Sequence, residues 1–154
     1  MHYLKCDTDG GWPNNQTEGT DGSRYGTTLG TFHNGLTEHG TAFKLSPDGE
    51  FTVLTRDCFG FSCIDAPLAG LVQASDGNFY GITVAGGKFS NGAIFQVTPI
   101  GELRTVHSFY YEDGVDVVHP EAPMIEGTNG ALYGTTVSGG IGGGSGDAQQ
   151  YAFR

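Results

Sequence analysis

The chain has 154 residues, 27 of them glycine, and a formal net charge of −10. This length fits one domain covering residues 1–154. The acidic balance argues against nucleic acid and anionic membranes as partners, because no basic stripe is present to neutralise phosphates. No apolar run approaches the ~20 residues that span a bilayer. Frequent glycine with scattered tyrosine and phenylalanine predicts short strands joined by tight turns.

The N-terminal segment, residues 1–19, is predicted to begin with a strand. Its first ten residues resemble residues 106–114, which belong to an alternating strand pattern further along the chain. The same ten residues lack a basic region followed by an apolar core, so we expect no signal peptide.

A first repeat covers residues 20–74 and opens with the phrase Thr-Asp-Gly-Ser-Arg-Tyr-Gly-Thr-Thr. Asp21 and Gly22 predict a tight turn, because glycine adopts a positive φ without a steric penalty. Residues 42–49 contain a third strand with its Pro-Asp-Gly turn, and residues 51–55 supply a fourth strand.

A second repeat covers residues 75–127 and opens with Ser-Asp-Gly-Asn-Phe-Tyr-Gly-Ile-Thr. A short apolar strand at 68–74 precedes it. Further strands are predicted at the three segments 78–84, 93–98 and 102–109. In the last of these, alternation places Leu103, Thr105 and His107 on one face of the strand.

A partial third repeat covers residues 128–154 and opens with Thr-Asn-Gly-Ala-Leu-Tyr-Gly-Thr-Thr. Residues 151–154 resemble residues 41–44, so we expect the last residues to form the third strand of a third blade. The repeated tyrosines, Tyr25, Tyr80 and Tyr133, stand 55 and 53 residues apart.

Four antiparallel strands in a unit of this length are typical of a propeller blade. The fold class is therefore predicted as all-β, a β-propeller with about three four-stranded blades per chain. Three blades are too few to close a ring, since four to eight are usual. We expect a six-bladed homodimer in which each N-terminal strand completes the third blade of the partner. The alternative is that the chain is a fragment of a longer repeat array.

The repeated phrase, the Gly-Gly loop at Gly86 and Gly87, the Phe-x-(Val/Leu)-(Ser/Thr)-Pro-x-Gly pattern and a late Ser-Phe together resemble the Gloeo/Verruco-type tandem repeat. The resemblance covers residues 1–140. It implies a bacterial propeller-like repeat protein, often secreted or surface-anchored, with no shared catalytic motif. It suggests a location outside the cytoplasm, whereas the missing signal peptide leaves a cytoplasmic location open. The strand plan also resembles six-bladed NHL-type and gluconolactonase-type propellers.

In a propeller plan the tight turns share one end of the blades and the longer loops share the other. Asp21, Asp48 and Asp76 are therefore interpreted as structural turn residues. The long loops carry much of the acid and histidine content. Carboxylates that converge there could bind a hard cation such as Ca²⁺ through oxygen ligands, and the alternative is that these acids are simply solvated. The predicted metal ligands are Asp57, Asp65, Asp113 and Asp116.

Three loop residues are the candidate general acid/base groups: His39, His119 and Glu121. No nucleophile elbow and no P-loop is present in the sequence. Cys6, Cys58 and Cys63 are an odd set without zinc spacing, and we leave open whether Cys58 and Cys63 form a bridge. Trp12, Tyr110 and Tyr111 either line a ligand pocket or cap blade edges.

Two functions follow from these observations. The first is a Ca²⁺-dependent hydrolase of small lactones or esters, in which the metal polarises the carbonyl and a loop histidine or carboxylate activates water. It follows the architectural precedent of the gluconolactonase-type propellers. The second is a non-catalytic binding or scaffold module that recognises carbohydrate or a protein partner.

Overall fold

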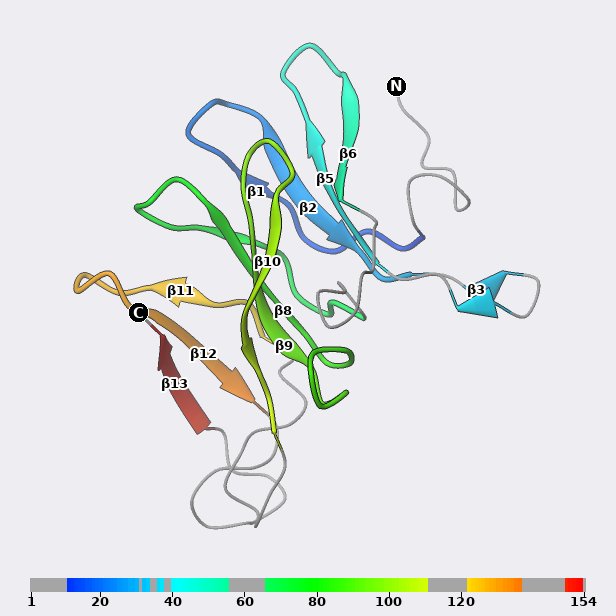
Figure 1. Ribbon diagram of the computed structural model, residues 1–154. Helices are drawn as coiled ribbons and strands as arrows, with labels where there is room; N and C mark the ends of the chain where they lie inside the picture. The colour runs from blue at the N-terminus through cyan, green and yellow to red at the C-terminus, as the bar shows by residue number, and fades with distance from the viewer. Residues whose placement is uncertain are drawn as a thin grey trace.

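A computed structural model describes residues 11–30, 32–33, 36–37, 40–55, 66–110, 122–136 and 149–153. These residues form three radial sheets and one small hairpin, and their arrangement resembles part of a β-propeller (Figure 1). The all-β prediction is therefore confirmed. We call the sheets blade 1, blade 2 and blade 3. Among the described residues, no helix is long and apolar enough to cross a membrane.

Blade 1 is a four-stranded antiparallel sheet in the order β1-β2-β5-β6. Its strands are β1 (Thr17–Glu18), β2 (Arg24–Thr28), β5 (Thr41–Leu45) and β6 (Phe51–Thr55). The predicted fourth strand at 51–55 is confirmed. The hairpin of β3 (Phe32–His33) and β4 (Leu36–Thr37) lies between β2 and β5, where the sequence predicted only a loop.

Blade 2 repeats this order with β7 (Val72–Gln73), β8 (Phe79–Thr83), β9 (Ala93–Val97) and β10 (Leu103–Ser108). The alternation predicted for β10 holds from Leu103 to His107, because Leu103, Thr105 and His107 are half-buried while Arg104 and Val106 are exposed. Ser108, predicted on the same face as Arg104 and Val106, departs from it because it is half-buried. The register between β9 and β10 shifts between Thr105 and His107.

Blade 3 contains β11 (Ile125–Glu126), β12 (Leu132–Thr136) and β13 (Gln149–Phe153). The predicted third strand is present, but its register differs from the sequence interpretation. Tyr151 pairs with Gly134, just as Phe43 pairs with Gly26 and Phe95 with Gly81. Tyr151 is therefore the counterpart of Phe43, and not of Thr41 as the sequence suggested. A shift of two residues leaves every side chain on the same face, so alternation alone cannot reveal it.

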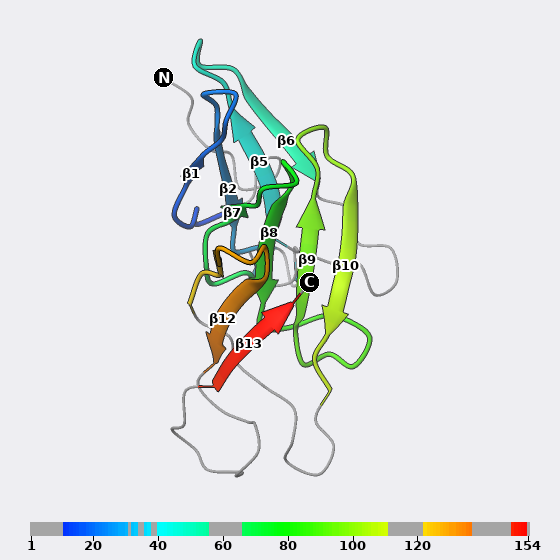
Figure 2. The same cartoon turned by 90° about the vertical axis from the view of Figure 1, so that its left-hand side faces the viewer.

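The apolar core lies between the blades. One cluster joins blade 1 to blade 2 through Tyr25, Ala42, Leu71, Phe79, Phe95 and Val97. A second joins blade 2 to blade 3 through Ala74, Ile82, Ile94, Phe109, Met124 and Leu132. In the view of Figure 2, blades 1 and 3 lie on opposite sides of blade 2. Each blade thus buries apolar surface against its neighbour, which is how thin sheets acquire a core.

In blades 1 and 2, the glycine of the Tyr-Gly step allows an aromatic ring from the neighbouring strand to lie against the backbone. A Cβ on Gly26 would lie 2.6 Å from Cζ of Phe43, and a Cβ on Gly81 would overlap the ring of Phe95. No side chain fits there without displacing the ring, so glycine is required at this step for close packing.

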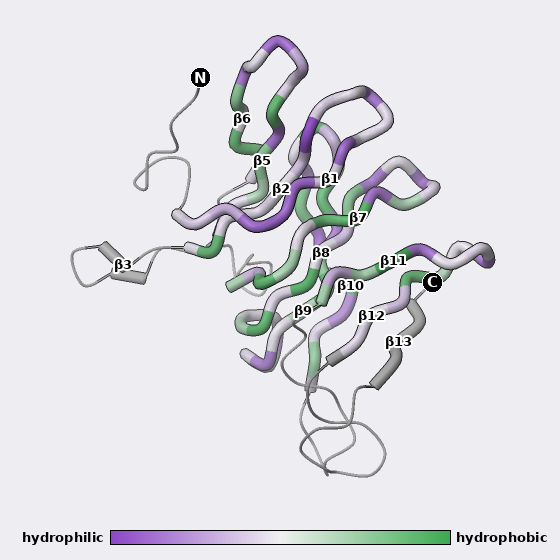
Figure 3. Tube along the Cα trace, turned by 180° about the vertical axis from the view of Figure 1, so that it is seen from behind, coloured by the Kyte–Doolittle hydropathy of each residue, from purple (hydrophilic) through white to green (hydrophobic). Residues whose placement is uncertain are grey.

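The two ends of the blades differ. At one end, the turn end, the strand pairs β1–β2, β5–β6, β7–β8, β9–β10 and β11–β12 are joined by tight turns (Figure 1). The tips of several of these turns are purple, and so hydrophilic, in the trace of Figure 3. The opposite end, the loop end, carries the hairpin β3–β4 and the loop between β8 and β9.

The N-terminal strand predicted within residues 1–10 lies outside the described residues. The borders predicted for the three repeats remain predictions. The sheets themselves extend from Thr17 to Thr55, from Val72 to Ser108 and from Ile125 to Phe153.

Candidate functional site

The repeated Asp/Asn-Gly phrase forms the same hydrogen-bonded turn in each blade. Oδ1 of Asp21 accepts from N of Ser23 at 3.0 Å, and Oδ1 of Asp76 accepts from N of Asn78 at 2.9 Å. In blade 3, Oδ1 of Asn129 accepts from N of Ala131 at 3.1 Å. Each side chain therefore closes its own turn, as predicted for Asp21 and Asp76.

The repeated tyrosine locks this turn to the following strand. The Tyr25 hydroxyl donates to Oδ2 of Asp21 at 2.9 Å, and the Tyr80 hydroxyl donates to Oδ2 of Asp76 at 2.8 Å. In blade 3 the polarity is reversed, because Nδ2 of Asn129 donates to the Tyr133 hydroxyl at 2.8 Å. An asparagine amide thus forms this turn in blade 3, where a carboxylate forms it in blades 1 and 2.

The electrostatics of the turn end agree with a structural role. The ammonium of Lys44, 2.9 Å from Oδ2 of Asp21, holds the pKa of that carboxyl well below its usual range. Burial raises the pKa of the Tyr25 hydroxyl. Burial opposes the shift at Asp76, but hydrogen bonds from Asn78 and Tyr80 still lower its pKa. Carboxylates held in the ionised form by several donors are weak bases and poor candidates for proton transfer.

The residues predicted to bind metal or to catalyse all lie outside the described residues. These are the metal candidates Asp57, Asp65, Asp113 and Asp116 and the acid/base candidates His39, His119 and Glu121. Cys6, Cys58, Cys63 and Tyr111 lie outside them as well. Within the part of the chain that is described, no group of three or more His, Cys, Asp or Glu side chains could hold a metal ion.

The loop between β8 and β9 is anchored to the strands on which it sits. The backbone N of Gly92 donates to O of Gly86 at 3.1 Å, and N of Phe109 donates to O of Gly92 at 3.0 Å. The backbone N of Lys88 donates to Oγ of Ser108 at 3.0 Å. These bonds tie both halves of the loop to the end of β10, so its side chains are presented from a fixed backbone.

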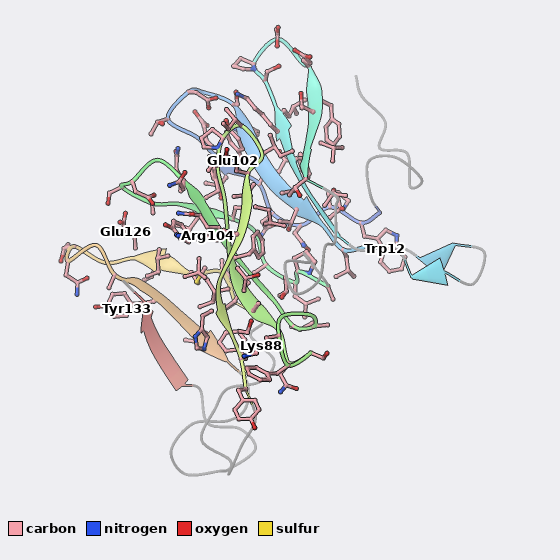
Figure 4. All side chains as sticks on the ribbon, in the orientation of Figure 1. Trp12, Lys88, Glu102, Arg104, Glu126 and Tyr133 are labelled. Carbon is pink, nitrogen blue, oxygen red and sulfur yellow. The ribbon has the colours of Figure 1, made fainter. Side chains whose placement is uncertain are left out.

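This loop presents an exposed aromatic pair. The rings of Phe89 and Tyr110 have centroids 4.3 Å apart and an interplanar angle of 49°. Phe89 is 39% exposed and Tyr110 is 38% exposed. The ammonium of Lys88 lies 5.2 Å from the centroid of the Phe89 ring. Two aromatic faces and a cation therefore meet at the loop end, where Figure 4 labels Lys88.

Trp12 is a further aromatic residue at this end and is 75% exposed. The adjacent Pro13 bridges to Thr28, the last residue of β2, which places Trp12 where β2 ends (Figure 4). The sequence singled out Trp12 and Tyr110 as possible pocket residues but missed Phe89. The signal for Phe89 was the phenylalanine in the loop 86–92. His107, interpreted as a strand residue, does lie in β10, where its ring packs edge-on against Phe109 at 5.4 Å.

Comparison with solved structures places the fold among propellers. A streptogramin B lyase matches with a TM-score of 0.52 and 20% identity, over 97% of this chain and 42% of the lyase. A protein classed as a gluconolactonase matches with a TM-score of 0.52 and 15% identity, over 92% of this chain and 48% of that protein. The chain therefore spans less than half the length of each. At such identities the likeness concerns the fold alone.

Among curated proteins, none matches the chain. The model of the Gloeobacter/Verrucomicrobia repeat matches residues 1–147. The Asp/Asn-Gly turn, the tyrosine that hydrogen-bonds to it and the glycine that follows this tyrosine occur once in each copy of the repeat. The chain belongs to the Gloeobacter/Verrucomicrobia repeat family.

Proposed function

We propose that the chain is a propeller-type binding module that recognises carbohydrate at its loop end. The observation that carries this proposal is the aromatic pair of Phe89 and Tyr110, with Lys88 beside it. Aromatic faces exposed on an anchored loop offer the apolar C–H face of a sugar ring a stacking surface. The Lys88 ammonium supplies hydrogen-bond donors for hydroxyl or carboxylate groups.

The position of this pair also supports binding. Phe89 and Tyr110 belong to different connections of blade 2, one between β8 and β9 and one after β10. Their meeting results from the fold and not from adjacency in sequence. Ligand sites commonly combine aromatic walls with a few polar groups.

A glycan array followed by titration calorimetry with the best-binding oligosaccharide tests the proposal. We expect Phe89→Ala to weaken binding about tenfold, equivalent to about 1.4 kcal/mol. The control is Ile100→Ala, which removes a side chain that is 82% exposed at the turn end, and it should leave binding unchanged. Absence of glycan binding, or equal weakening by both variants, would contradict the proposal.

A Ca²⁺-dependent hydrolase of small lactones or esters is the second candidate. It is favoured by chain order, since its candidate residues follow strands that end at the loop end: Asp57 and Asp65 after β6, and Asp113, Asp116, His119 and Glu121 after β10. His39 precedes β5 at the same end. In this mechanism the carboxylates would hold Ca²⁺, which would supply Lewis-acid polarisation of the carbonyl, and His39, His119 or Glu121 would take a proton from water.

Hydrolysis of a sugar δ-lactone and of an aryl ester, with and without EDTA, tests this candidate. EDTA should abolish turnover and added Ca²⁺ should restore it. Asp113→Ala and His119→Ala should each lower turnover at least a hundredfold, whereas Asp76→Ala should lower stability alone. If EDTA changes neither turnover nor melting temperature, this candidate fails.

We further propose that two chains close a six-bladed ring. Three blades correspond to 42% and 48% of the two propeller proteins compared above, so two copies supply about one ring. Closure by further blades of a longer chain is the competing arrangement. Sedimentation equilibrium of this chain separates the two, because a folded monomer contradicts the homodimer.

A further inference from the structure

Adjacent blades are joined by a polar contact that occurs twice at the same position of the repeat. Between blades 1 and 2, N of Thr20 donates to Oε1 of Gln73 at 2.8 Å. Between blades 2 and 3, N and Oγ of Ser75 donate to the two carboxylate oxygens of Glu126 at 2.8 and 2.7 Å. Each blade therefore holds the Asp/Asn-Gly turn of the preceding blade with a side chain from its own first strand.

A packing contact repeats beside this polar one. Phe79, the first residue of β8, stacks on Tyr25 of blade 1 with centroids 3.9 Å apart. Leu132, the first residue of β12, shares an apolar cluster with Tyr80 of blade 2. The first residue of β8 thus stacks on the repeated tyrosine of blade 1, and the first residue of β12 belongs to the cluster against which Tyr80 of blade 2 packs.

Blades 1 and 3 each have one outer face, and these faces carry the counterparts of the residues that form the two internal contacts. On blade 3, Thr128 is the counterpart of Thr20 and Ser75, and it is exposed. Tyr133 is the counterpart of Tyr25 and Tyr80, and it is half-buried. It lines an open hollow of about 310 Å³ with Pro123, Ile125, Gly134 and Thr135. In Figure 4, Tyr133 lies on the outer side of β12, away from β8.

On blade 1, Glu18 is the counterpart of Gln73 and Glu126, and Arg24 is the counterpart of Phe79 and Leu132. Oε2 of Glu18 lies 3.4 Å from Nη2 of Arg24, and their side chains are 66% and 53% exposed. The pair therefore stands together on the face of blade 1 that points away from blade 2.

We propose that the outer face of blade 1 in one copy docks on the outer face of blade 3 in a second copy. The Glu18 carboxylate accepts hydrogen bonds from N and Oγ1 of the second copy's Thr128. The guanidinium of Arg24 stacks on the ring of Tyr133 and fills the hollow beside it. This inference rests on the proposed six-bladed homodimer and assigns its interface, which occurs twice in the closed ring.

The residue types support a second copy as the occupant. The internal contacts use Phe79 and Leu132, which are buried, but the docking face uses Arg24. On blade 1, Gln16 occupies the repeat position that the buried Leu71 and Met124 occupy in blades 2 and 3, and Gln16 is also exposed. A face that meets water before assembly tolerates arginine and glutamine, and arginine on tyrosine is a favourable cation–π pair. The two internal contacts between blades serve as the template for how these residues approach each other in the proposed interface.

Sedimentation equilibrium of the full chain and its variants measures the dissociation constant of the dimer. Arg24→Ala and Tyr133→Ala should each raise it at least tenfold. Arg104→Ala is the matched control, since it removes the same charge from exposed β10, away from this interface, and should change nothing. Gln73→Ala breaks an internal contact and should lower the melting temperature without weakening the dimer.

Mixing the two interface variants gives a result that a folding defect would not produce. A heterodimer of Arg24→Ala with Tyr133→Ala has one doubly altered interface and one intact interface. The mixture should therefore dimerise more tightly than either variant alone, because coupled contacts are lost together.

Two results would overturn the inference, and they are distinguishable. If the wild-type chain forms a dimer that none of the interface variants weakens, the assigned interface is wrong while the proposed homodimer stands. If the wild-type chain is a folded monomer, the proposed homodimer and the assigned interface both fail. Circular dichroism of each variant verifies that the blades are folded.

Discussion

The turn end and the loop end of the blades use their side chains in different ways. At the turn end, Asp21 and Asp76 are held by a backbone N–H and a tyrosine hydroxyl, and the pattern recurs in every blade. At the loop end, Phe89 and Tyr110 present exposed rings from an anchored backbone. The turn-end side chains are therefore engaged in maintaining the fold, whereas the exposed rings at the loop end are available for binding.

The largest effect is expected where the repeat packs most closely. A Cβ on Gly81 would overlap the Phe95 ring and lie 2.9 Å from Cδ2 of Leu71. Gly81→Ala should therefore lower the free energy of unfolding by about 2–3 kcal/mol, as overpacking does. Urea denaturation followed by circular dichroism measures it.

Gly77→Ala is the control within the same blade. Gly77 has a φ of 84° and nothing within 4 Å of an added Cβ, so only backbone strain of about 1 kcal/mol is expected. An equal loss in both variants would show that close packing at Gly81 is not the constraint.

A smaller effect is expected for the turn itself. Asp76→Ala removes the acceptor for N of Asn78 and for the Tyr80 hydroxyl, at a cost of about 1–2 kcal/mol. Asp76→Asn should cost less than about 0.5 kcal/mol, because Asn129 forms the same turn in blade 3. Thermal melts of the two variants provide the comparison. If the asparagine variant melts as low as the alanine variant, the amide does not replace the carboxylate in blade 2.

The ion pair at the turn end predicts a pH dependence. The pKa of Asp21 is lowered by Lys44, so its contribution is complete above the unfolded value of about 4 and declines as pH falls below it. The Asp21 side chain is 43% exposed, which limits the contribution to about 1 kcal/mol or less. Wild type should exceed Asp21→Asn in stability at pH 7, and the gap should shrink by pH 3 in urea titrations. A constant gap would exclude ionisation of Asp21 as its cause.

Much of the fold could be predicted because strand alternation and turn residues are local. The strand at Phe51–Thr55 was predicted residue for residue, and β9 and β10 within one residue at each end. The first strand of blade 2 was predicted at 68–74, but β7 contains only Val72–Gln73. There the backbone meets blade 1 instead, because O of Leu71 accepts from the Thr17 hydroxyl. Contacts between blades are not encoded in local pattern.

The candidate site was less accessible to sequence reasoning. Tyr110 and Phe89 meet only because β10 ends beside the β8–β9 loop, and the bond from N of Lys88 to Oγ of Ser108 that joins these segments spans 20 residues. Nothing in the spacing of aromatic residues indicates this pairing. The acid and histidine candidates were chosen by their place in long loops, and they remain predictions.

The smallest effect on stability is expected at the loop end. Phe89→Ala removes a ring that is 39% exposed and packs mainly on Tyr110, so the free energy of unfolding should change by about 0.5 kcal/mol or less. The same variant should weaken carbohydrate binding about tenfold, so at the loop end the effect on binding exceeds the effect on stability. Melting temperature and glycan affinity measured on one preparation provide the test. A large loss of stability in this variant would show that the Phe89–Tyr110 pair maintains the fold, and the distinction between the turn end and the loop end would no longer separate structure from function.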